Sequence, residues 1–252
     1  MISGALGTLA PPQLVRERAF EEVRDAIIAG RIAPGARLIE RELCAALGVS
    51  RASVREVIRR LEAERLVSVE PRKGPTVMAL TRKDATEIYE VRALLEALLI
   101  ERFTDVASGD EIAHLEGIFT EVRAAAASNA VSEIVALMLR VNDHLLDVVR
   151  HDVARDLLRQ LNARINFLRV RAMAKPGRIA ASLEEIGAIL DAVRGRDGAR
   201  AGELMKASVE HARDAALEQL ALLGSHRERD HPSGRRREPD GSRRALGHRD
   251  SR

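Results

Sequence analysis

Three arginines at regular intervals are the side chains in this sequence best suited to binding a polyanion. Arg51, Arg55 and Arg59 are four residues apart, so on a helix they lie on one face. Just before them, Gly48 can take the positive φ of a tight turn and Ser50 can cap the helix that follows. We therefore predict a turn and then a helix with a stripe of guanidinium groups, which can donate hydrogen bonds to DNA bases or phosphates.

An apolar face lies next to this basic stripe. It consists of Val54, Val57, Ile58 and Leu61. One face of the helix can therefore pack while its neighbour carries charge. This pattern is typical of the second helix of a helix-turn-helix, whose N-terminal residues enter the major groove of DNA. A solvated basic surface is the alternative for this helix taken alone.

Two further helices are predicted before the arginine-bearing helix. Apolar residues recur at helical intervals over residues 13–29, and a turn containing Pro34 and Gly35 follows. A second helix is predicted at about residues 40–47. The helix with the arginines then runs from residue 51 to about residue 65, which completes a three-helix unit.

A hairpin is predicted after the third helix, because the sequence switches to the alternation of β-strands. Residues 66–69 and 76–80 flank a polar turn that contains Arg72 and Lys73. Three helices followed by a hairpin is the order of a winged helix-turn-helix. Arg72 and Lys73 at the tip of the wing would contact phosphates, which positions a protein on DNA without reading the base sequence.

The composition limits the classes of function that are open to this chain. Its 252 residues are 46% hydrophobic, enough for a core in each of two domains, but only 2% aromatic. Stacking platforms for single-stranded nucleic acid need aromatic rings, so recognition of duplex DNA through arginine fits better. The net charge is only +3, so any nucleic-acid surface must be a local cluster of basic residues.

The sequence carries no sign of secretion or of a membrane span. The single cysteine, Cys44, cannot form an internal disulfide and has no neighbours at metal-ligand spacing. The N-terminus lacks a signal-peptide pattern, and no apolar run approaches the length of a membrane helix. We expect a cytoplasmic protein with no membrane partner.

The N-terminal region resembles the DNA-binding domain of GntR-family bacterial transcription regulators. The resemblance covers about residues 14–80 and lies in the runs at residues 30–38, 40–43, 47–51, 54–56 and 61–62. It implies that Arg41, Arg51, Arg55 and the wing Gly74 belong to the DNA interface. Ala52 and Ser53 depart from the family pattern, which usually has Thr and often Pro there. The predicted DNA-binding residues are Arg41, Ser50, Arg51, Ala52, Ser53, Arg55, Lys73 and Gly74.

Residues 81–223 show helical periodicity with no strand-like run of consequence. Six helices are predicted, beginning near Thr81, Ser108, Ser132, Val153, Ile179 and Gly198. The hydroxyls of Thr81, Ser108 and Ser132 are expected to cap three of them, and the first should reach about Phe103. Short connections favour an antiparallel all-α bundle, and bundles form ligand cavities between their helices.

This region resembles the ligand-sensing FCD domain of the FadR-type GntR subfamily, through Arg92 and Glu96, His144, and residues 185–192. Many members hold a divalent metal with one Asp and three His, and an effector carboxylate completes its coordination. The corresponding residues here are Arg140, His144, Ile186 and Ser208. One imidazole cannot hold a metal that needs three or four protein ligands, so we predict neither a metal nor another cofactor. A shifted alignment could bring in His211, but Arg140 and Ile186 would still not be ligands.

The resemblance and the helical spacing place three candidate effector-binding residues at the cavity, namely Arg92, Arg140 and His144. Arg140 and His144 are one turn apart and could both face the cavity from its edge. An inward guanidinium needs a partner, because an unpaired buried charge is very costly. An anionic effector could supply that partner. The alternatives for Arg140 are an internal pair with Glu96 or another carboxylate, or simple exposure to solvent.

Taken together, these features predict a mainly α protein with four regions. They are a disordered segment at residues 1–12, a winged helix-turn-helix at 13–80, an all-helical effector-binding and dimerisation domain at 81–223, and a disordered basic tail at 224–252. The tail could add non-specific DNA affinity or be an inert extension.

The predicted function is that of a transcription regulator and repressor, not of an enzyme. It would bind a palindromic double-stranded operator as a homodimer, because one short helix contacts too few base pairs to be selective. A small anionic metabolite in the helical domain would control it. The alternatives are a winged helix used as a protein–protein module, or a regulator that works without an effector.

Overall fold

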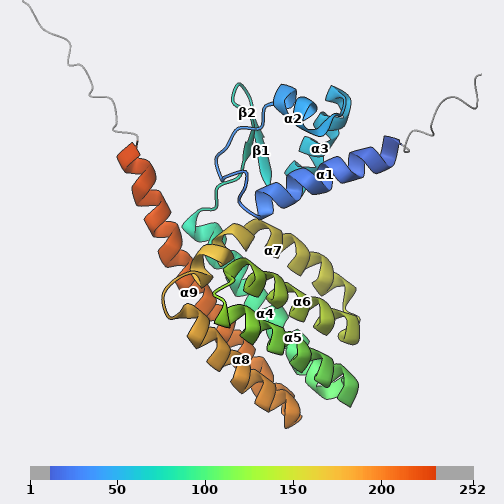
Figure 1. Ribbon diagram of the computed structural model, residues 1–252, viewed down its shortest axis with the longest axis vertical. Coiled ribbons are helices and arrows are strands. Elements are labelled where there is room, and N and C mark those ends of the chain that lie inside the picture. The colour runs from blue at the N-terminus through green and yellow to red at the C-terminus, as the bar shows by residue number, and fades with distance from the viewer. Residues whose placement is uncertain (1–11, 231–252) are drawn as a thin grey trace, which may run out of the picture.

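The computed structural model describes residues 12–230, and these form nine helices and one two-stranded hairpin (Figure 1). In chain order they are α1 Pro12–Ile28, α2 Glu40–Leu47, α3 Arg51–Ala63, β1 Val67–Glu70, β2 Gly74–Val77, α4 Arg82–Val106, α5 Gly109–Ala127, α6 Val131–Val149, α7 Asp152–Met173, α8 Arg178–Arg194 and α9 Gly198–Asp230. The predictions about residues 1–11 and 231–252 lie outside the described residues.

The N-terminal domain packs α1, α2, α3 and the hairpin around one apolar core. The strands β1 and β2 are antiparallel, with Val67 opposite Val77 and Glu70 opposite Gly74. The apolar face predicted for α3 is buried in this core. The order of three helices and a wing is confirmed, although β2 was expected at residues 76–80. It begins at Gly74 because this residue, at φ 75°, ends the turn, and the chain leaves the sheet after Val77.

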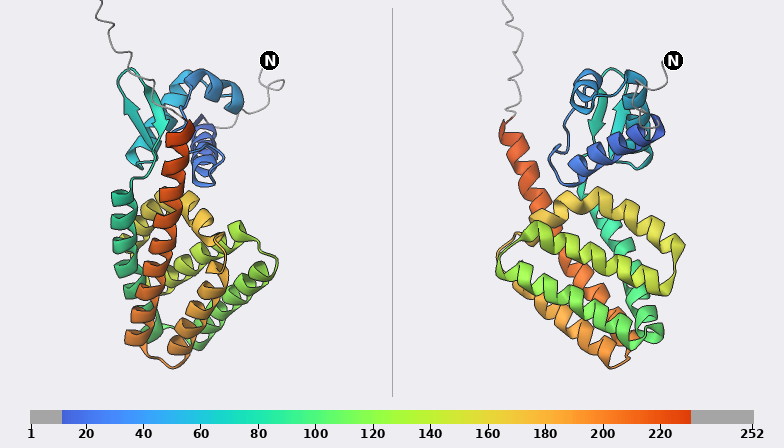
Figure 2. Two further views of the ribbon diagram at one scale, coloured as in Figure 1. Left: turned by 90° about the vertical axis from the view of Figure 1, so that its left-hand side faces the viewer. Right: turned by 45° about the vertical axis from the view of Figure 1, so that its right-hand side comes forward.

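The C-terminal domain is an all-α bundle of six helices, α4 to α9, around a second apolar core (Figure 2). The fold class is therefore confirmed. Helices α4 and α9 lie side by side along much of their length, and α5 and α6 form an antiparallel pair. The predicted caps Thr81 and Ser108 each form a capping box, with Asp84 and Glu111 respectively. None of the described helices is both long and apolar enough to cross a bilayer.

Three predicted helix boundaries in the bundle were wrong. The α4 helix continues past Phe103 to Val106. The α6 helix begins at Val131, without a side-chain cap, so Ser132 lies inside its first turn. The chain turns at Asn129, which has a φ of 53°, and the helix can start directly afterwards. The α9 helix continues to Asp230, past the expected end at Leu223, although apolar periodicity stops there.

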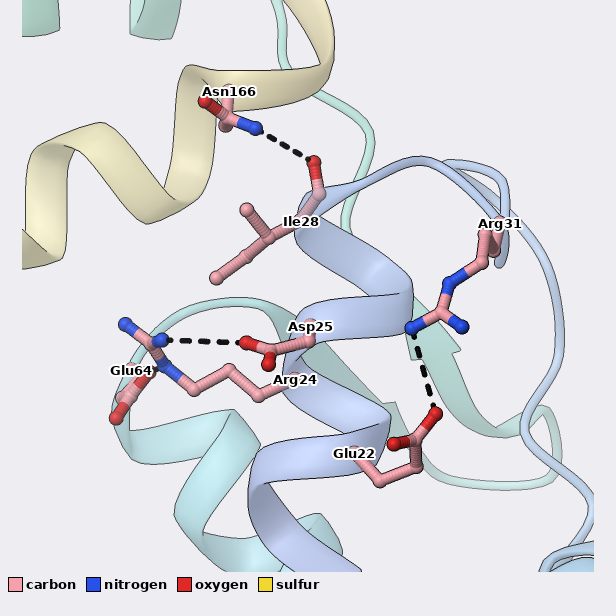
Figure 3. A network of polar contacts seen from close by, with 7 residues as sticks. All are labelled: Glu22, Arg24, Asp25, Ile28, Arg31, Glu64 and Asn166. Carbon is pink, nitrogen blue, oxygen red and sulfur yellow. Dashed lines mark hydrogen bonds and ion pairs between the residues drawn. The ribbon is translucent and has the colours of Figure 1, made fainter. Parts of the chain in front are cut away.

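The two domains meet at α7, which lies against the end of α1 (Figure 3). The Asn166 side-chain amide donates a hydrogen bond of 3.2 Å to the backbone carbonyl of Ile28, one of the free carbonyls at the helix end. Gly30 follows with a φ of 75°, and a Cβ there would lie 2.4 Å from Phe167 Cδ2. Ala163 is buried within the N-terminal core. One face of α7 is therefore part of the N-terminal domain's packing.

Candidate DNA interface and bundle cavity

The turn before α3 has the geometry that the sequence predicted. Gly48 is left-handed, at φ 65° and ψ 28°, and Ser50 is the N-cap of α3. The Ser50 hydroxyl accepts a hydrogen bond of 3.2 Å from the Ser53 backbone N–H. This fixes the start of α3 at Arg51, and Figure 1 shows α2 and α3 in the domain that stands apart from the helical bundle. The first turn of α3 is the part that a helix-turn-helix presents to DNA.

The arginines predicted to bind DNA are all exposed on the α2–α3 surface. They are Arg41, Arg51 and Arg55. Ala52 is exposed beside them. Arg55 Nε lies 3.3 Å from Glu40 Oε2, in an ion pair whose arginine side chain is 66% exposed. Exposed pairs of this kind are worth little, so a phosphate can replace the carboxylate at small cost.

Ser53 differs from the other predicted DNA-binding residues. It is only 8% exposed, and its hydroxyl lies 3.1 Å from the Ser50 hydroxyl. Its position follows from the helix itself, because it precedes Val54 at the edge of the buried face. The structure therefore places Ser53 in the cap that organises the start of α3, instead of on the exposed surface.

The wing tip carries the other predicted contacts. Lys73 is exposed and paired with Glu70 at 2.6 Å, a hydrogen bond that raises the pKa of Lys73. Gly74 has a φ of 75°, and a Cβ there would lie 3.4 Å from Arg37 Nη2. The exposed Arg37 is a wing-side cation that the sequence did not single out. Its bridge to Thr76 of β2, which is not local in sequence, brings it there.

The bundle encloses a cavity of about 70 Å³ between α4, α6, α7, α8 and α9. Arg92, one of the predicted effector residues, lines this cavity. Its Nε and Nη2 atoms donate to Glu96 Oε1 at 3.0 and 2.7 Å, and both side chains are at most 6% exposed. Arg169 of α7 lines the same cavity, and Glu96 is the one carboxylate among the residues that line it.

Three buried polar atoms on this cavity have no hydrogen-bond partner among the residues that the structure describes. They are Arg92 Nη1, Arg169 Nη1 and the Tyr89 hydroxyl oxygen. Burial and then repulsion from Arg92 lower the pKa of Arg169 to about 10. Arg169 therefore still carries its charge at neutral pH. The helical pattern gave no reason to select Arg169 or Tyr89, because each occupies a position that could equally be core or surface.

A second polar group closes the cavity on the side of α8 and α9. Arg178 donates to both carboxylate oxygens of Glu185 at 3.0 Å, and Ser208 donates to Glu185 at 2.7 Å. His211 Nδ1 lies 3.0 Å from the same carboxylate. Burial alone would raise the pKa of Glu185, but these hydrogen bonds outweigh it and lower the pKa. The charge of Arg178 is thus balanced by the Glu185 carboxylate, whereas Arg169 forms no ion pair with a carboxylate of the described residues.

The positions expected for Arg140 and His144 were wrong, because neither residue lines the cavity. Arg140 is half exposed and forms an ion pair of 2.6 Å with Glu121 on α5, one of the alternatives considered above. The α6 residues that face the cavity include Met138 and Asn142. Arg140 is two residues from each, and two residues turn a side chain by about 200° around a helix.

His144 packs between α6 and α5. Its Nε2 atom lies 2.8 Å from the backbone oxygen of Glu111, and its ring contacts the rings of His114 and Phe103 at centroid distances of 4.6 and 5.4 Å. These contacts account for the imidazole as part of the packing. Asn142, a cavity residue that the sequence analysis missed, was detectable from its helical spacing with Val135 and Met138.

The cavity does not suit the divalent metal that the FCD resemblance implies. Ile186 is buried apolar packing, and Ser208 donates its hydroxyl to Glu185. Within residues 12–230, no three His, Cys, Asp or Glu side chains are grouped as a metal site would require. The charged groups that do face the cavity include Arg92 and Arg169, which repel a cation. The hydrogen-bond donors of these arginines are suited to an anion.

Two family models match this chain, one for each domain. Residues 15–77 match the model of the bacterial regulatory proteins of the gntR family, and residues 87–211 match the model of the FCD domain. The regulator YdhC of Bacillus subtilis, an uncharacterized protein of the HTH type, is 30% identical over 193 residues, which cover 76% of this chain and 86% of YdhC. The resemblance seen in the sequence is confirmed.

Relatives with assigned roles include repressors. The transcriptional repressor RspR of Escherichia coli is 23% identical over 190 residues, which cover 75% of this chain and 83% of RspR. The gluconate operon repressor of Bacillus subtilis is 39% identical over 89 residues, about a third of either chain. A solved GntR regulator from Rhodococcus sp. RHA1 is 28% identical with a TM-score of 0.69, over 81% of this chain and 97% of the other.

Proposed function

This chain belongs to the GntR family of bacterial transcription regulators and carries an FCD domain, and on that premise we propose how it acts. It represses transcription by binding a palindromic operator as a homodimer, and a small anionic metabolite in the bundle cavity changes its affinity for DNA. The family is one of transcription regulators with a DNA-binding helix-turn-helix, not of enzymes. Repression is proposed because relatives such as RspR are repressors.

The observation that carries the proposed effector is the set of unpaired donors in the bundle cavity. Arg92 Nη1 and the Tyr89 hydroxyl of α4 and Arg169 Nη1 of α7 line the cavity and are buried without hydrogen-bond partners among the described residues. Unpaired buried donors are costly, and one carboxylate can accept hydrogen bonds from several of them. The small volume of about 70 Å³ favours a short organic acid over a large ligand.

The proposed homodimer rests on the outer face of α4. Val91 and Leu94 lie three residues apart on this helix and are 43% and 63% exposed. Large apolar side chains that recur at helical spacing on an exposed face are typical of an interface. A dimer would also place two copies of α3 on successive half-sites of DNA.

The DNA and effector arms are tested together. Duplexes selected from a random pool by the purified protein should contain inverted repeats, and short carboxylates such as lactate and succinate should raise the protein's melting temperature and change its affinity for the selected duplex. Failure of the selection to enrich any DNA sequence would contradict the DNA assignment. If no short acid changes the affinity for DNA or the melting temperature, the effector proposal is contradicted, while the DNA assignment stands.

The dimer is tested by Leu94→Glu, with Leu157→Glu on α7 as the control. Leu157 is 42% exposed and lies outside the proposed interface. Light scattering should show a monomer for Leu94→Glu alone, because a charge at the centre of an apolar interface has no partner. A wild-type monomer, or equal behaviour of both variants, would contradict the assignment of α4 as the interface.

A further inference from the structure

A second and larger pocket lies at the junction of the two domains. Its volume is about 450 Å³, and its walls come from the turn at residues 33–34, the linker at residues 78–82, α7 and the C-terminal part of α9. We call it the junction groove. This volume is in the range of small-molecule sites. The junction groove shares no lining residue with the bundle cavity, although α7 and α9 contribute to both.

The floor of the junction groove is apolar. Met78 and Leu80 come from the linker, Phe167 and Leu168 from α7, and Leu220 from α9. Met78 is 37% exposed, which is high for a large apolar residue. Such a surface can accept an alkyl chain or an aromatic ring, because moving apolar area out of water is favourable.

Three arginines, Arg82, Arg164 and Arg171, surround this apolar floor. The Arg164 side chain is only 14% exposed, and its buried Nε has no hydrogen-bond partner in the described part of the chain. Its nearest carboxylate is Asp84, 3.8 Å from Nη2, which already accepts hydrogen bonds from Thr81 as the cap of α4. Within the described residues, Arg82 and Arg171 form no ion pair with a carboxylate.

We propose that the junction groove binds an amphipathic organic anion, with its apolar body on the floor and its carboxylate at Arg164 and Arg171. Arg171 is positioned for this contact because its guanidinium stacks over the Phe167 ring, 5.0 Å from the centroid. Arg164 Nε is a donor that no described residue accepts. The groove therefore combines apolar volume with more positive charge than its one nearby carboxylate, Asp84, can balance, and a neutral apolar ligand would leave that excess unpaired.

An occupant of the groove would contact both domains at once. Phe167 forms part of the groove floor and also lies against Gly30, directly after α1. Met78 and Leu80 lie in the only stretch of chain that joins the wing to the bundle. Binding would therefore restrict the orientation of the DNA-binding domain relative to the bundle, and it would do so independently of the bundle cavity.

The probe for this site is decanoate, with decanamide as the neutral control, measured by calorimetry on the full chain below the concentration at which decanoate forms micelles. We expect one saturable decanoate site and about tenfold weaker binding of decanamide, because the amide carbonyl can still accept a hydrogen bond but carries no charge to pair with the arginines. No saturable binding of decanoate, or equal binding of both probes, would overturn the proposal.

Three variants test whether decanoate binds in the junction groove. Ala221→Trp fills the groove from its exposed α9 wall and should abolish decanoate binding. Arg171→Gln, at an exposed residue, should weaken binding about tenfold, whereas Arg102→Gln, at an exposed residue of α4, should leave it unchanged. Decanoate binding that survives Ala221→Trp would overturn the proposal.

A cavity variant separates the junction groove from the proposed effector site. Arg169→Met alters the bundle cavity and should leave decanoate affinity unchanged. Loss of decanoate binding in Arg169→Met, with retention in Ala221→Trp, would show that decanoate enters the bundle cavity. That result would overturn the second site while supporting the effector proposal, so the two proposals fail in distinguishable ways.

Discussion

The arginines of α3 and those of the bundle cavity have the same chemistry in opposite environments. Arg51 and Arg55 lie in water on an exposed face, so their charges cost nothing to hold while DNA is absent. Arg92 and Arg169 line a small cavity where only Arg92 is paired with Glu96, and each has a buried Nη1 without a hydrogen-bond partner among the described residues. The comparison shows that an exposed charge is stabilised by water without a ligand, whereas a buried charge without a full set of partners lowers the free energy of unfolding.

The largest effect is expected from Arg92→Met. This change leaves the Glu96 carboxylate buried without its hydrogen-bonded partner, and breaking a buried pair in this way costs about 3–5 kcal/mol of unfolding free energy. Urea denaturation measures the loss. The double variant Arg92→Met with Glu96→Met should recover most of it, and an equally unstable double variant would contradict the explanation.

Arg169→Met should have the opposite sign. Arg169 has a buried Nη1 without a partner and a pKa lowered by burial, so an apolar side chain of similar length should stabilise the ligand-free protein by about 1–4 kcal/mol. The thermal response to short carboxylates should disappear at the same time. Arg140→Met, at the exposed pair with Glu121, is the control and should change neither property. A destabilised Arg169→Met that still responds to acids would contradict the assignment.

Substitution of an exposed arginine on α3 should weaken DNA binding without changing the stability of the protein. Arg51→Ala should weaken binding to a selected duplex by about 1–3 kcal/mol and relax base preference, because a guanidinium contact to a base edge is lost. Arg123→Ala, at an exposed residue of α5, is the matched control. Fluorescence anisotropy gives both affinities, and undiminished binding by Arg51→Ala would contradict the role of α3.

The smallest effect concerns pH and the Glu185 group. Hydrogen bonds from Arg178, Ser208 and His211 outweigh the effect of burial and hold the pKa of Glu185 below its ordinary 4.5. The stabilisation is therefore fully present above pH 4.5 and is lost as the pH falls through the lower folded value. The melting temperature of Glu185→Gln should fall less steeply with acid than that of the wild type. Glu203→Gln, in an exposed pair, should behave like the wild type.

The DNA-binding domain was largely predictable because its signals are local. Gly48 and Ser50 act within one turn, so their residue types are sufficient to place the start of α3. The exposed stripe of Arg51, Arg55 and Arg59 followed from their spacing, whereas Arg41 was identified through the family resemblance. The burial of Ser53 was not predictable, because it depends on how the first turn of α3 packs, which the spacing of charges does not reveal.

The bundle cavity was less predictable because several helices must converge to form it. Arg92 was identified, but Arg140 and His144 were placed at the cavity when they face α5. A difference of two residues on α6 separates Arg140 from the cavity residue Asn142, and sequence alone does not fix the rotation of a helix to that accuracy. Arg169 has no distinguishing neighbour in the sequence.

The sequence by itself determined the order of helices and wing, the start of the recognition helix and the exposed basic stripe, since each depends on residues within a few positions of one another. Only the tertiary structure decided which arginines lack a carboxylate partner and where α7 meets the end of α1. These properties depend on distances between helices far apart in the chain, and the cost of a buried charge depends on those distances. The same residue type is therefore an exposed, solvated charge on α3 and a buried, incompletely paired charge on α7.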